Sequence, residues 1–470
     1  LGAAQLDELL VLRAASGFTE TFGNPRKFAR IARRVGRRRP IVAIRTGDAG
    51  RGAATAALYE QTGVVEVPTV RSMLDTARVL ASQPIPAGPR VAIISNSRSP
   101  GVLARAALTN AGLTVVESPI ALDWRAAPAE FGPAVRAAIE SATVDAVLVI
   151  HAPPIVSAEA PVAEVDAAAA GSLKPVVAVM LGRDDGPIQP GSAVPTFSFP
   201  EPAAAVLGRM WRYRRWLDSE AAAPLPSPAD LGVEPGIVAT LIADVLDRGD
   251  QTPSLDDCRA ILMAYGLSVP DSIRLDHPTP ESAVAAAATL GYPVAMKSTR
   301  RRAGRSVEAG VALDLPDDHG VADALGVMRT SLGDDADVVV LQSMVSPGVD
   351  VRIRCTTDER LGALLTFGLG GMTADAIGDE TSRLVPVSPA AAENLVLASR
   401  ANVALQSAGI ATDALVDTIV RVAQLMADHP EIAVLDINPA IVSGRGCQIA
   451  DVEMVLSENS TPDAAMRRLI

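Results

Sequence analysis

Lysine is rare in this sequence, and one lysine stands where it could bind a phosphate. The 470 residues contain only three lysines, Lys27, Lys174 and Lys297, although Lys and Arg together number 42. Lys297 follows the apolar stretch 293–296, and a polar loop with two glycines then leads back into apolar residues 311–313. This order predicts a buried strand, a flexible loop and a second strand. A compact cation at the strand end would suit a phosphate group, and a lysine that reaches solvent is the alternative.

A second group of side chains offers oxygen atoms at a regular spacing. The stretch 435–439 alternates apolar and polar residues, which puts Asp436 and Asn438 on one face of a strand. After a turn at 443–446, a second polar stretch places Asp451 on the adjacent strand of the hairpin. Oxygen ligands from neighbouring strands, with positions left open for phosphates, would suit Mg²⁺ bound to a nucleotide. A hairpin with two acids is also an ordinary surface feature, so this pattern alone leaves both interpretations open.

The elements that must hold these side chains follow from length and composition. At ~150 residues per domain, 470 residues predict roughly three domains. Hydrophobic residues make up 49% and aromatic residues 3%, which favours the aliphatic cores of parallel α/β layers. Over 87–218, strands alternate with helices at the spacing of a doubly wound parallel sheet. Ligands bind at the carboxyl ends of such strands, so the loop 96–101 is the predicted functional edge, and its backbone amides could hold a phosphate.

Residues 1–86 show fewer recognisable strands. A helix is predicted over 25–39 and a strand over 40–44, which is the only obvious strand before Gly47. One face of the helix is strongly basic, and it is either an anion-binding or docking surface or a solvated helix face. One strand cannot complete a parallel sheet, and the chain starts at Leu1 in sequence that already resembles a helix. We therefore expect the chain to be a piece of a longer polypeptide.

Charge and cysteine content narrow the class of protein. The net charge of −12 argues against nucleic acid as the main partner. The three cysteines, Cys258, Cys355 and Cys447, lie far apart without CxxC spacing, which predicts a reducing compartment and neither zinc nor disulfides. The longest apolar runs are far shorter than the ~20 residues of a membrane helix. These features predict a cytoplasmic protein that does not bind membranes.

The motifs around Lys297 and the oxygen-bearing side chains resemble the ATP-grasp domain of the ADP-forming acyl-CoA synthetases, the group of acetate–CoA ligase and succinyl-CoA synthetase. Gly291–Lys297 resembles the nucleotide-binding lysine strand of that domain. Leu341–Asp350 resembles its interlobe strand, with Asp350 where the family usually has Glu, and Phe367–Gly371 resembles its glycine-rich segment. Asp-Ile-Asn-Pro from Asp436, followed by Ala450 and Asp451, resembles its metal-binding end.

The first half of the chain resembles the flavodoxin-like parts of the same synthetases. Phe22–Phe28 is similar to a signature of their first flavodoxin-like subdomain, and the loop 96–101 is similar to their Asn-x-Gly-Gly-Pro-Gly loop. The resemblance implies an α/β protein with two succinyl-CoA-ligase-like flavodoxin subdomains, each a doubly wound parallel sheet, followed by an ATP-grasp domain. The expected boundaries are 1–86 for an N-terminally incomplete first subdomain, 87–218 for the second, 219–252 for a linker and 253–470 for the ATP-grasp domain.

The resemblance also implies site residues, cofactors and partners. ATP and Mg²⁺ are the expected cofactors, and CoA or acyl-CoA would bind through an upstream Rossmann domain that this chain lacks. Nucleotide and acyl-CoA are then the expected small-molecule partners, and a homo-oligomer is the expected assembly. The residues implied for ATP are Lys297, Ser306, Gln342, Met344, Asp350, Gly370 and Gly371. Those implied for the metal are Asn438, Asp451 and Asp436.

The family's phosphorelay histidines have no counterpart in this sequence. In the family, a phosphoryl group passes from the acyl phosphate through a histidine in a Ser-His-Thr-Gly-Ala motif to ADP. The corresponding residues Arg45–Gly52 contain no histidine, and Gly304–Ser306 replaces the family's second histidine loop. Glu20 remains at the position of a carboxylate that orients the lost histidine. The four histidines of the chain lie in other segments: His151, His277, His319 and His429.

Three functions agree with this pattern. The first is a nucleotide-binding module that is catalytically silent or regulatory, within a protein acetyltransferase that fuses it to a GNAT domain. The second is an active ADP-forming acyl-CoA ligase that converts an acyl acid, ATP and CoA into acyl-CoA, ADP and phosphate. The third is a structural or oligomerisation module with vestigial sites. Titration with Mg·ATP separates the third from the others, and a synthesis assay separates the first two.

Overall fold

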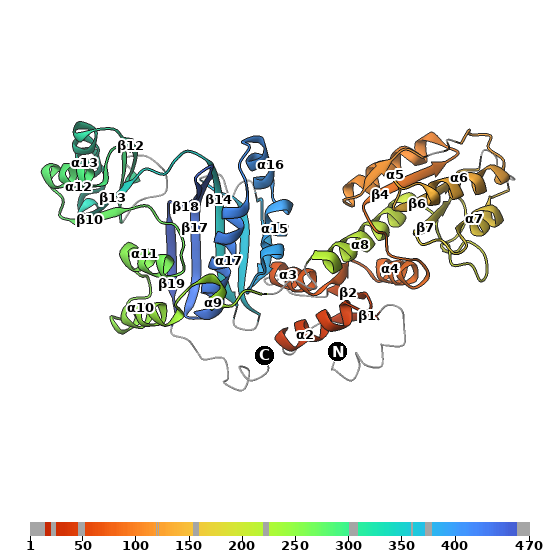
Figure 1. Ribbon diagram of the computed structural model, residues 1–470, viewed down its shortest axis with the longest axis horizontal. Helices are drawn as coiled ribbons and strands as arrows, with labels where there is room; N and C mark the ends of the chain where they lie inside the picture. The colour runs from red at the N-terminus through yellow and green to blue at the C-terminus, as the bar shows by residue number, and fades with distance from the viewer. Residues whose placement is uncertain are drawn as a thin grey trace. The chain divides into compact units, whose positions relative to one another are not determined.

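The chain folds into two compact units, Leu1–Ala222 and Ala223–Ile470 (Figure 1). The computed structural model describes residues 15–19, 25–45, 52–118, 120, 122–153, 159–219, 225–299, 309–358, 361–371 and 378–457. Each unit contains two sheets. Among the described residues, no helix is long and apolar enough to cross a membrane.

The first unit opens with a small parallel sheet of three strands in the order β1-β2-β3. Its strands are β1 (Ala15–Thr19), β2 (Ile41–Arg45) and β3 (Val64–Val67). The prediction of a single strand before Gly47 is therefore wrong, because β1 pairs with β2 along its whole length. The segment Ala-Ser-Gly-Phe-Thr has neither an alternating nor a continuous apolar pattern, so its sequence does not reveal a strand. The helices of this part are α2 (Pro25–Gly36), α3 (Gly52–Thr62) and α4 (Val70–Ser82).

The second sheet of this unit has six strands in the order β5-β4-β6-β7-β9-β8, parallel except for the pair β8 and β9. Every residue of β6 and β7 is buried, as expected for strands covered on both faces. The doubly wound sheet is thus confirmed. The strands are β4 (Arg90–Ser95), β5 (Thr114–Val116), β6 (Ala146–His151), β7 (Val176–Met180), β8 (Gly186–Pro187) and β9 (Pro195–Phe197). The helices are α5 (Arg98–Asn110), α6 (Pro128–Glu140), α7 (Val162–Ala169) and α8 (Pro200–Ser219).

The second unit carries a four-stranded antiparallel sheet in the order β10-β13-β11-β12. Its strands are β10 (Ser272–Asp276), β11 (Val294–Ser298), β12 (Val311–Leu315) and β13 (Val338–Ser343). The helices α12 (Pro280–Leu290) and α13 (Asp318–Leu332) pack on it through an apolar cluster that includes Met296, Leu325 and Leu341. The predicted strands on either side of the loop after Lys297 are confirmed as β11 and β12, which pair antiparallel.

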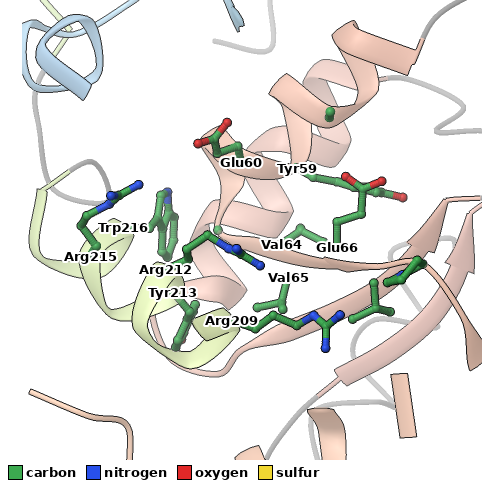
Figure 2. Close-up of a pocket in the computed structure, with 14 residues that line it drawn as sticks. Tyr59, Glu60, Val64, Val65, Glu66, Arg209, Arg212, Tyr213, Arg215 and Trp216 are labelled. Atoms are coloured by element: carbon green, nitrogen blue, oxygen red, sulfur yellow. The ribbon is translucent and has the colours of Figure 1, made fainter. Parts of the chain in front are cut away.

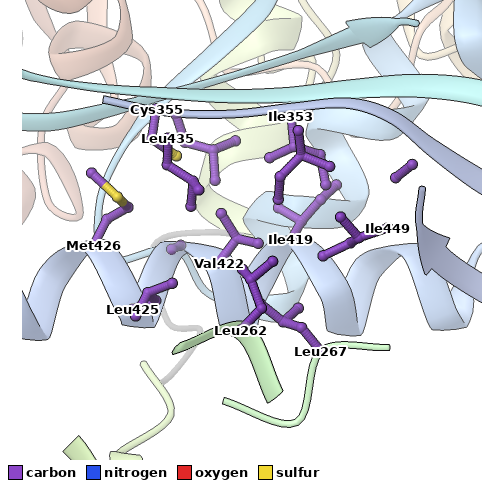
Figure 3. Packing of buried hydrophobic residues seen from close by; sticks show 14 of the residues in the cluster. Leu262, Leu267, Ile353, Cys355, Ile419, Val422, Leu425, Met426, Leu435 and Ile449 are labelled. Atoms are coloured by element: carbon purple, nitrogen blue, oxygen red, sulfur yellow. The ribbon is translucent and has the colours of Figure 1, made fainter. Parts of the chain in front are cut away.

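The larger sheet of the second unit has the order β16-β15-β14-β17-β18, and β19 also pairs with β17. Its strands are β14 (Val349–Asp358), β15 (Gly362–Leu369), β16 (Thr381–Leu384), β17 (Ile432–Ser443), β18 (Gly446–Ile449) and β19 (Val452–Leu456). Figure 3 shows α17 (Asp413–Asp428) packed against one face, with Ile419, Val422 and Met426 directed at Ile353 and Leu435. The opposite face carries Asp350, Arg352 and Arg354 of β14 and Asp436 of β17. The predicted turn at 443–446 is confirmed, because Ser443 pairs with Gly446.

Residues 219–252, which the sequence analysis assigned to a linker, contain two helices in the described part. These are α9 (Pro228–Leu231) and α10 (Pro235–Asp247). Val238, Ile242 and Val245 of α10 are buried in the apolar cluster of the second unit, together with Leu262 of α11 (Leu255–Ala264). The helix α10 therefore packs as part of this unit. The domain boundaries themselves stay a prediction.

All three cysteines lie in the second unit, where they are buried and unpaired. Burial raises the pKa of the Cys258 thiol to about 12 and that of the Cys447 thiol to about 11. Burial also raises the pKa of Cys355, which lies on β14. A thiol that is both buried and protonated reacts slowly, so thiol labelling reports the unfolding of this unit within the full chain.

Candidate nucleotide-binding site

Lys297 and Gln342 lie on neighbouring strands and point to the same carbonyl group. β11 pairs with β13 so that Ala295 stands opposite Gln342, which puts Lys297, two residues on, on the same face as Gln342. The Lys297 Nζ donates to the Ala450 carbonyl at 2.6 Å, and the Gln342 Nε2 donates to it at 3.4 Å. Both side chains are buried, at 9% and 8% exposure. With Asp451 they line a cavity of about 40 Å³, which is too small for a nucleotide.

Asn438 of β17 joins Asp451 to the glycine-rich segment. Its Oδ1 accepts a hydrogen bond from the Gly371 backbone amide at 2.7 Å, and the backbone amide of Asn438 donates to the Asp451 carbonyl at 3.2 Å. Ala450 and Asp451 form the connection between β18 and β19, so the prediction that Asp451 lies on a strand is wrong. Their amides donate to the Pro439 carbonyl at 3.1 and 3.3 Å, which places Asp451 beside Asn438 without strand pairing.

A register shift between β14 and β17 contributes to this arrangement. Val351 pairs with Ala440 and Ile353 pairs with Ile437, so Asn438 and Pro439 together stand opposite one residue. A bulge of this kind turns side chains away from the regular alternation and is common beside binding sites. It lies next to Asp350, whose carbonyl accepts from the Gly370 amide at 2.9 Å.

At Gly368 and Gly370 the glycine-rich segment runs too close to its neighbours for a side chain. A Cβ on Gly370 would lie 2.5 Å from the Val351 carbonyl carbon, and one on Gly368 would lie 1.6 Å from the Asp379 carbonyl oxygen. Glycine is therefore required at these two positions for a steric reason, which is the close approach of two backbones. Gly371 adopts a φ of +87°, where glycine is the residue without strain.

Asp379 holds the far side of this segment in place. Its carboxylate accepts from the Leu369 amide at 3.2 Å, the Ser399 hydroxyl at 2.6 Å, and the amides of Arg400 and Ala401 at the start of α16 (Arg400–Ser407). Burial alone would raise the pKa of Asp379, but these four donors outweigh it and the pKa is lowered. Asp379 thus anchors β15 to α16, a structural role that the motif comparison did not predict.

Asp436, predicted near the metal, is engaged by an arginine. The Arg352 Nε donates to Asp436 Oδ1 at 2.9 Å and its Nη2 donates to Oδ2, and both side chains are 16% exposed. Arg354 stands directly opposite Asp436 in the strand register, and its side chain is 46% exposed. Its Nε lies 3.8 Å from Asp436 Oδ2. The bidentate pair engages both carboxylate oxygens, and the metal-binding role of Asp436 stays a prediction.

Replacing Arg352 with glutamine is expected to lower the free energy of unfolding of the second unit by about 1–3 kcal/mol, because a half-buried carboxylate loses a bidentate charged partner. Labelling of the buried cysteines during urea denaturation of the full chain measures this change. The matched control is Arg354→Gln, which removes the longer, exposed contact and should cost less than about 1 kcal/mol. Equal losses in the two variants would contradict the assignment of Arg352 as the main partner of Asp436.

The donor set fits a hard divalent cation on a nucleotide. Asn438 and Asp451, joined by a backbone hydrogen bond, carry an amide and a carboxylate oxygen, which are ligands that Mg²⁺ prefers when phosphates complete its coordination. Within the described residues, no group of three or more His, Cys, Asp or Glu that could hold a metal ion is present.

The remaining predicted residues divide into three groups. Met344, just after β13, is half-buried, and its amide approaches the Pro293 carbonyl at 3.4 Å. Ser306 and Glu20 lie outside the described residues, as do residues 46–51 of the loop that lacks the family histidine. In the first unit, the predicted functional edge contains Asn96, which is buried and bridges to Ala152 by two hydrogen bonds of 2.9 Å. Asn96 therefore joins the ends of β4 and β6.

Sequence reasoning missed Arg352, the Ala450 carbonyl and the anchor at Asp379. The alternation Asp350, Arg352, Arg354 could have indicated that these three share a strand face. The pairing with Asp436 depends on strand register, which sequence spacing does not show. A backbone carbonyl has no sequence signal at all, because every residue has one.

Comparison with known proteins identifies two domains. A succinyl-CoA ligase like flavodoxin domain matches residues 11–80, and an ATP-grasp domain matches residues 244–456. Among solved structures, the dinucleotide forming acetyl-coenzyme A synthetase 1 of Ca. Korarchaeum cryptofilum, in complex with coenzyme A and Mg-AMPPCP, is 23% identical, with a TM-score of 0.41. That match covers 47% of this chain and 100% of the other.

Curated relatives match nearly the whole chain. The 4-hydroxybutyrate–CoA ligase [ADP-forming] of Nitrosopumilus maritimus is 24% identical over 93% of this chain and 70% of the relative. The acetate–CoA ligase [ADP-forming] I of Archaeoglobus fulgidus is 26% identical over 94% of this chain and 70% of the relative. In this order the chain carries a flavodoxin-like domain and an ATP-grasp domain, and over more than nine-tenths of its length it is similar to these two ADP-forming acid–CoA ligases.

Proposed function

We propose that the chain is the nucleotide-binding part of an ADP-forming acyl-CoA ligase, which converts an acyl acid, ATP and CoA into acyl-CoA, ADP and phosphate. The observation that carries this proposal is the match of more than nine-tenths of the chain to two relatives named as ADP-forming acid–CoA ligases. Both relatives act on small acids by their names, acetate and 4-hydroxybutyrate, so a short-chain acid is the proposed acyl substrate class.

The contacts of the second unit support assigned roles for its residues. Lys297 would exchange its contact with the Ala450 carbonyl for a phosphate oxygen of ATP, since a buried ammonium group gains more from a full negative charge than from a neutral dipole. The amide of Gly371 already lies at Asn438, so the glycine-rich segment and the metal ligands converge on one place. We assign Asn438 and Asp451 to the metal, and Gln342, Met344 and Asp350 to the adenosine.

Mg²⁺, when bound, would neutralise charge on the phosphates during transfer. The surrounding residues position the nucleotide. The Gly371 backbone amide donates to Asn438 Oδ1 and so orients this side chain before a ligand arrives, and the Asn438 backbone is held by its hydrogen bond to the Asp451 carbonyl. Ser306, in the loop after Lys297, is proposed as a further phosphate contact, and Asp436 as a neighbour of the metal whose position depends on Arg352.

The acceptor of the phosphoryl group is the open step of this proposal, because the sequence lacks histidine at both family positions. Two described histidines, His151 and His429, are buried, with burial lowering the pKa of each. The alternative of a silent or regulatory module rests on this sequence difference. The relatives reported above are acid–CoA ligases, so the comparisons favour the active ligase, and an association with an acetyltransferase stays a prediction.

The test is a synthesis assay with the full chain, Mg·ATP, acetate or 4-hydroxybutyrate, and CoA, with and without a separately supplied CoA-binding domain. The proposal predicts acyl-CoA and ADP in equal amounts, with label from γ-labelled ATP appearing as phosphate. Calorimetric binding of Mg·ATP without any acyl-CoA would support the silent module instead. Absence of both binding and product would leave the structural module as the remaining function.

A further inference from the structure

A cavity of about 640 Å³ lies in the first unit, between α3, β3 and α8 (Figure 2). All of its lining residues belong to this unit, whereas the proposed nucleotide site belongs to the second. Its volume falls in the range that holds small-molecule ligands.

This cavity is lined by three arginines from the same side of one helix. Arg209, Arg212 and Arg215 of α8 are spaced three residues apart, which places their side chains next to one another. In Figure 2 the guanidinium groups of Arg209 and Arg212 extend toward β3. Arg209 and Arg212 also line a second hollow of about 470 Å³ beside α5.

Two of these arginines make few hydrogen bonds with the described residues. Arg209 donates one long hydrogen bond, to the Thr76 hydroxyl at 3.4 Å. Arg212 forms no hydrogen bond or ion pair with any residue that the structure describes, although Glu60 and Glu66 line the same cavity. The pKa of Arg209 and of Arg212 is lowered, first because protein displaces water around each guanidinium. A neighbouring arginine lowers each pKa further, and the carboxylates of Asp75 near Arg209 and Glu60 near Arg212 offset only part of the shift. An anion between them would offset both effects.

Two aromatic residues of α8 attach the cavity wall to the small sheet and its helices. Trp216 donates from its indole nitrogen to the Gln61 carbonyl at 3.1 Å, and its ring packs so closely on Gly63 that a Cβ there would lie 2.4 Å from it. Tyr213, one helical turn before, donates to the Gly36 carbonyl. These contacts fix α8, which carries the arginines, against the small sheet and its helices. A ligand would therefore find the site already formed.

The geometry points to a binding site for a small molecule that carries a phosphate group. Adjacent guanidinium forks match the oxygens of a phosphate, and each can donate two parallel hydrogen bonds. Apolar side chains of β3 and its end, including Val64, Val67 and Pro68, line the same space, and they would contact the organic part of the ligand. The cavity is large enough for a phosphate ester and not only for the free ion.

The experiment is calorimetric titration of the full chain with phenyl phosphate and, separately, with inorganic phosphate. Phenyl phosphate should bind with 1:1 stoichiometry and a Kd of about 1 mM or lower, and inorganic phosphate should bind more weakly because it lacks the apolar part. The same titration in a Lys297→Met background should give an unchanged Kd. Loss of binding in that background would place the ligand at the nucleotide site and overturn the inference.

Variants on α8 identify the residues that bind. Arg209→Gln combined with Arg212→Gln should weaken phenyl phosphate at least tenfold, and Arg212→Lys, which keeps the charge and the bulk, should weaken it less. The matched control is Arg214→Gln on the same helix, because Arg214 pairs with Asp218 at 2.8 Å and does not line the cavity. Unchanged affinity in the double variant, or no binding to the wild type below about 10 mM, would refute the site.

Discussion

Replacing Lys297 with methionine is expected to weaken Mg·ATP binding by roughly ten- to a hundredfold. Methionine has a similar volume and no charge, so the substitution removes the ammonium group and leaves the packing of β11 largely intact. Charge-assisted hydrogen bonds contribute about 1.5–3 kcal/mol, which corresponds to this loss of affinity. Because Lys297 is buried beside Gln342, few water molecules can take over its contact with a phosphate.

Calorimetry of Mg·ATP binding to the full chain measures the effect, and the sequence supplies a close control. Lys174 in the first unit also donates from its ammonium group to a backbone carbonyl, that of Ser141, at 2.7 Å. Lys174→Met removes the same kind of contact outside the proposed site and should leave the affinity unchanged. A Lys297 variant that binds as tightly as the wild type would show that ATP does not reach this strand end.

Much of the second unit could be predicted from sequence because its signals are local. The apolar run before Lys297 and the alternation around Asp436 each indicate a strand, and both strands are present as β11 and β17. The order of lysine, glycines and oxygen ligands then agreed with a family motif. The structure links these residues by hydrogen bonds. Lys297 and Gln342 both donate to the Ala450 carbonyl, and Asn438 bonds to Gly371 and to Asp451, the residue after Ala450.

The parts that sequence did not predict depend on tertiary packing. β1 and the short strands β8 and β9 have weak patterns of their own and form because neighbouring strands offer hydrogen-bond partners. The pairing of Asp436 with Arg352 follows from a shifted register. The arginines of α8 face a cavity only because Trp216 and Tyr213 fix that helix against the small sheet, and periodicity within α8 cannot show which element will lie opposite.

Substituting Gly368 with alanine is expected to destabilise the second unit by roughly 3 kcal/mol, because the new methyl group would overlap the Asp379 carbonyl oxygen. Neither side can move away easily. Gly368 lies within β15, paired with Arg352 of β14, and Asp379 is held by donors from Leu369, Ser399 and the first residues of α16. The strain should therefore reach the adjacent residues 370 and 371, and Mg·ATP binding should weaken as well.

Thiol labelling of the three buried cysteines during urea denaturation of the full chain reports the free energy of unfolding for this unit. The matched control is Gly326→Ala, since Gly326 lies inside α13 of the same unit with no atom within 4 Å of the added Cβ. In a helix interior this change should stabilise by roughly 0.5–1 kcal/mol. The same chemical substitution thus carries opposite signs at the two glycines. If Gly368→Ala were as stable as the wild type, the backbones of β15 and residue 379 could not approach as closely as the structure places them, and the glycine-rich segment would need another explanation than close packing.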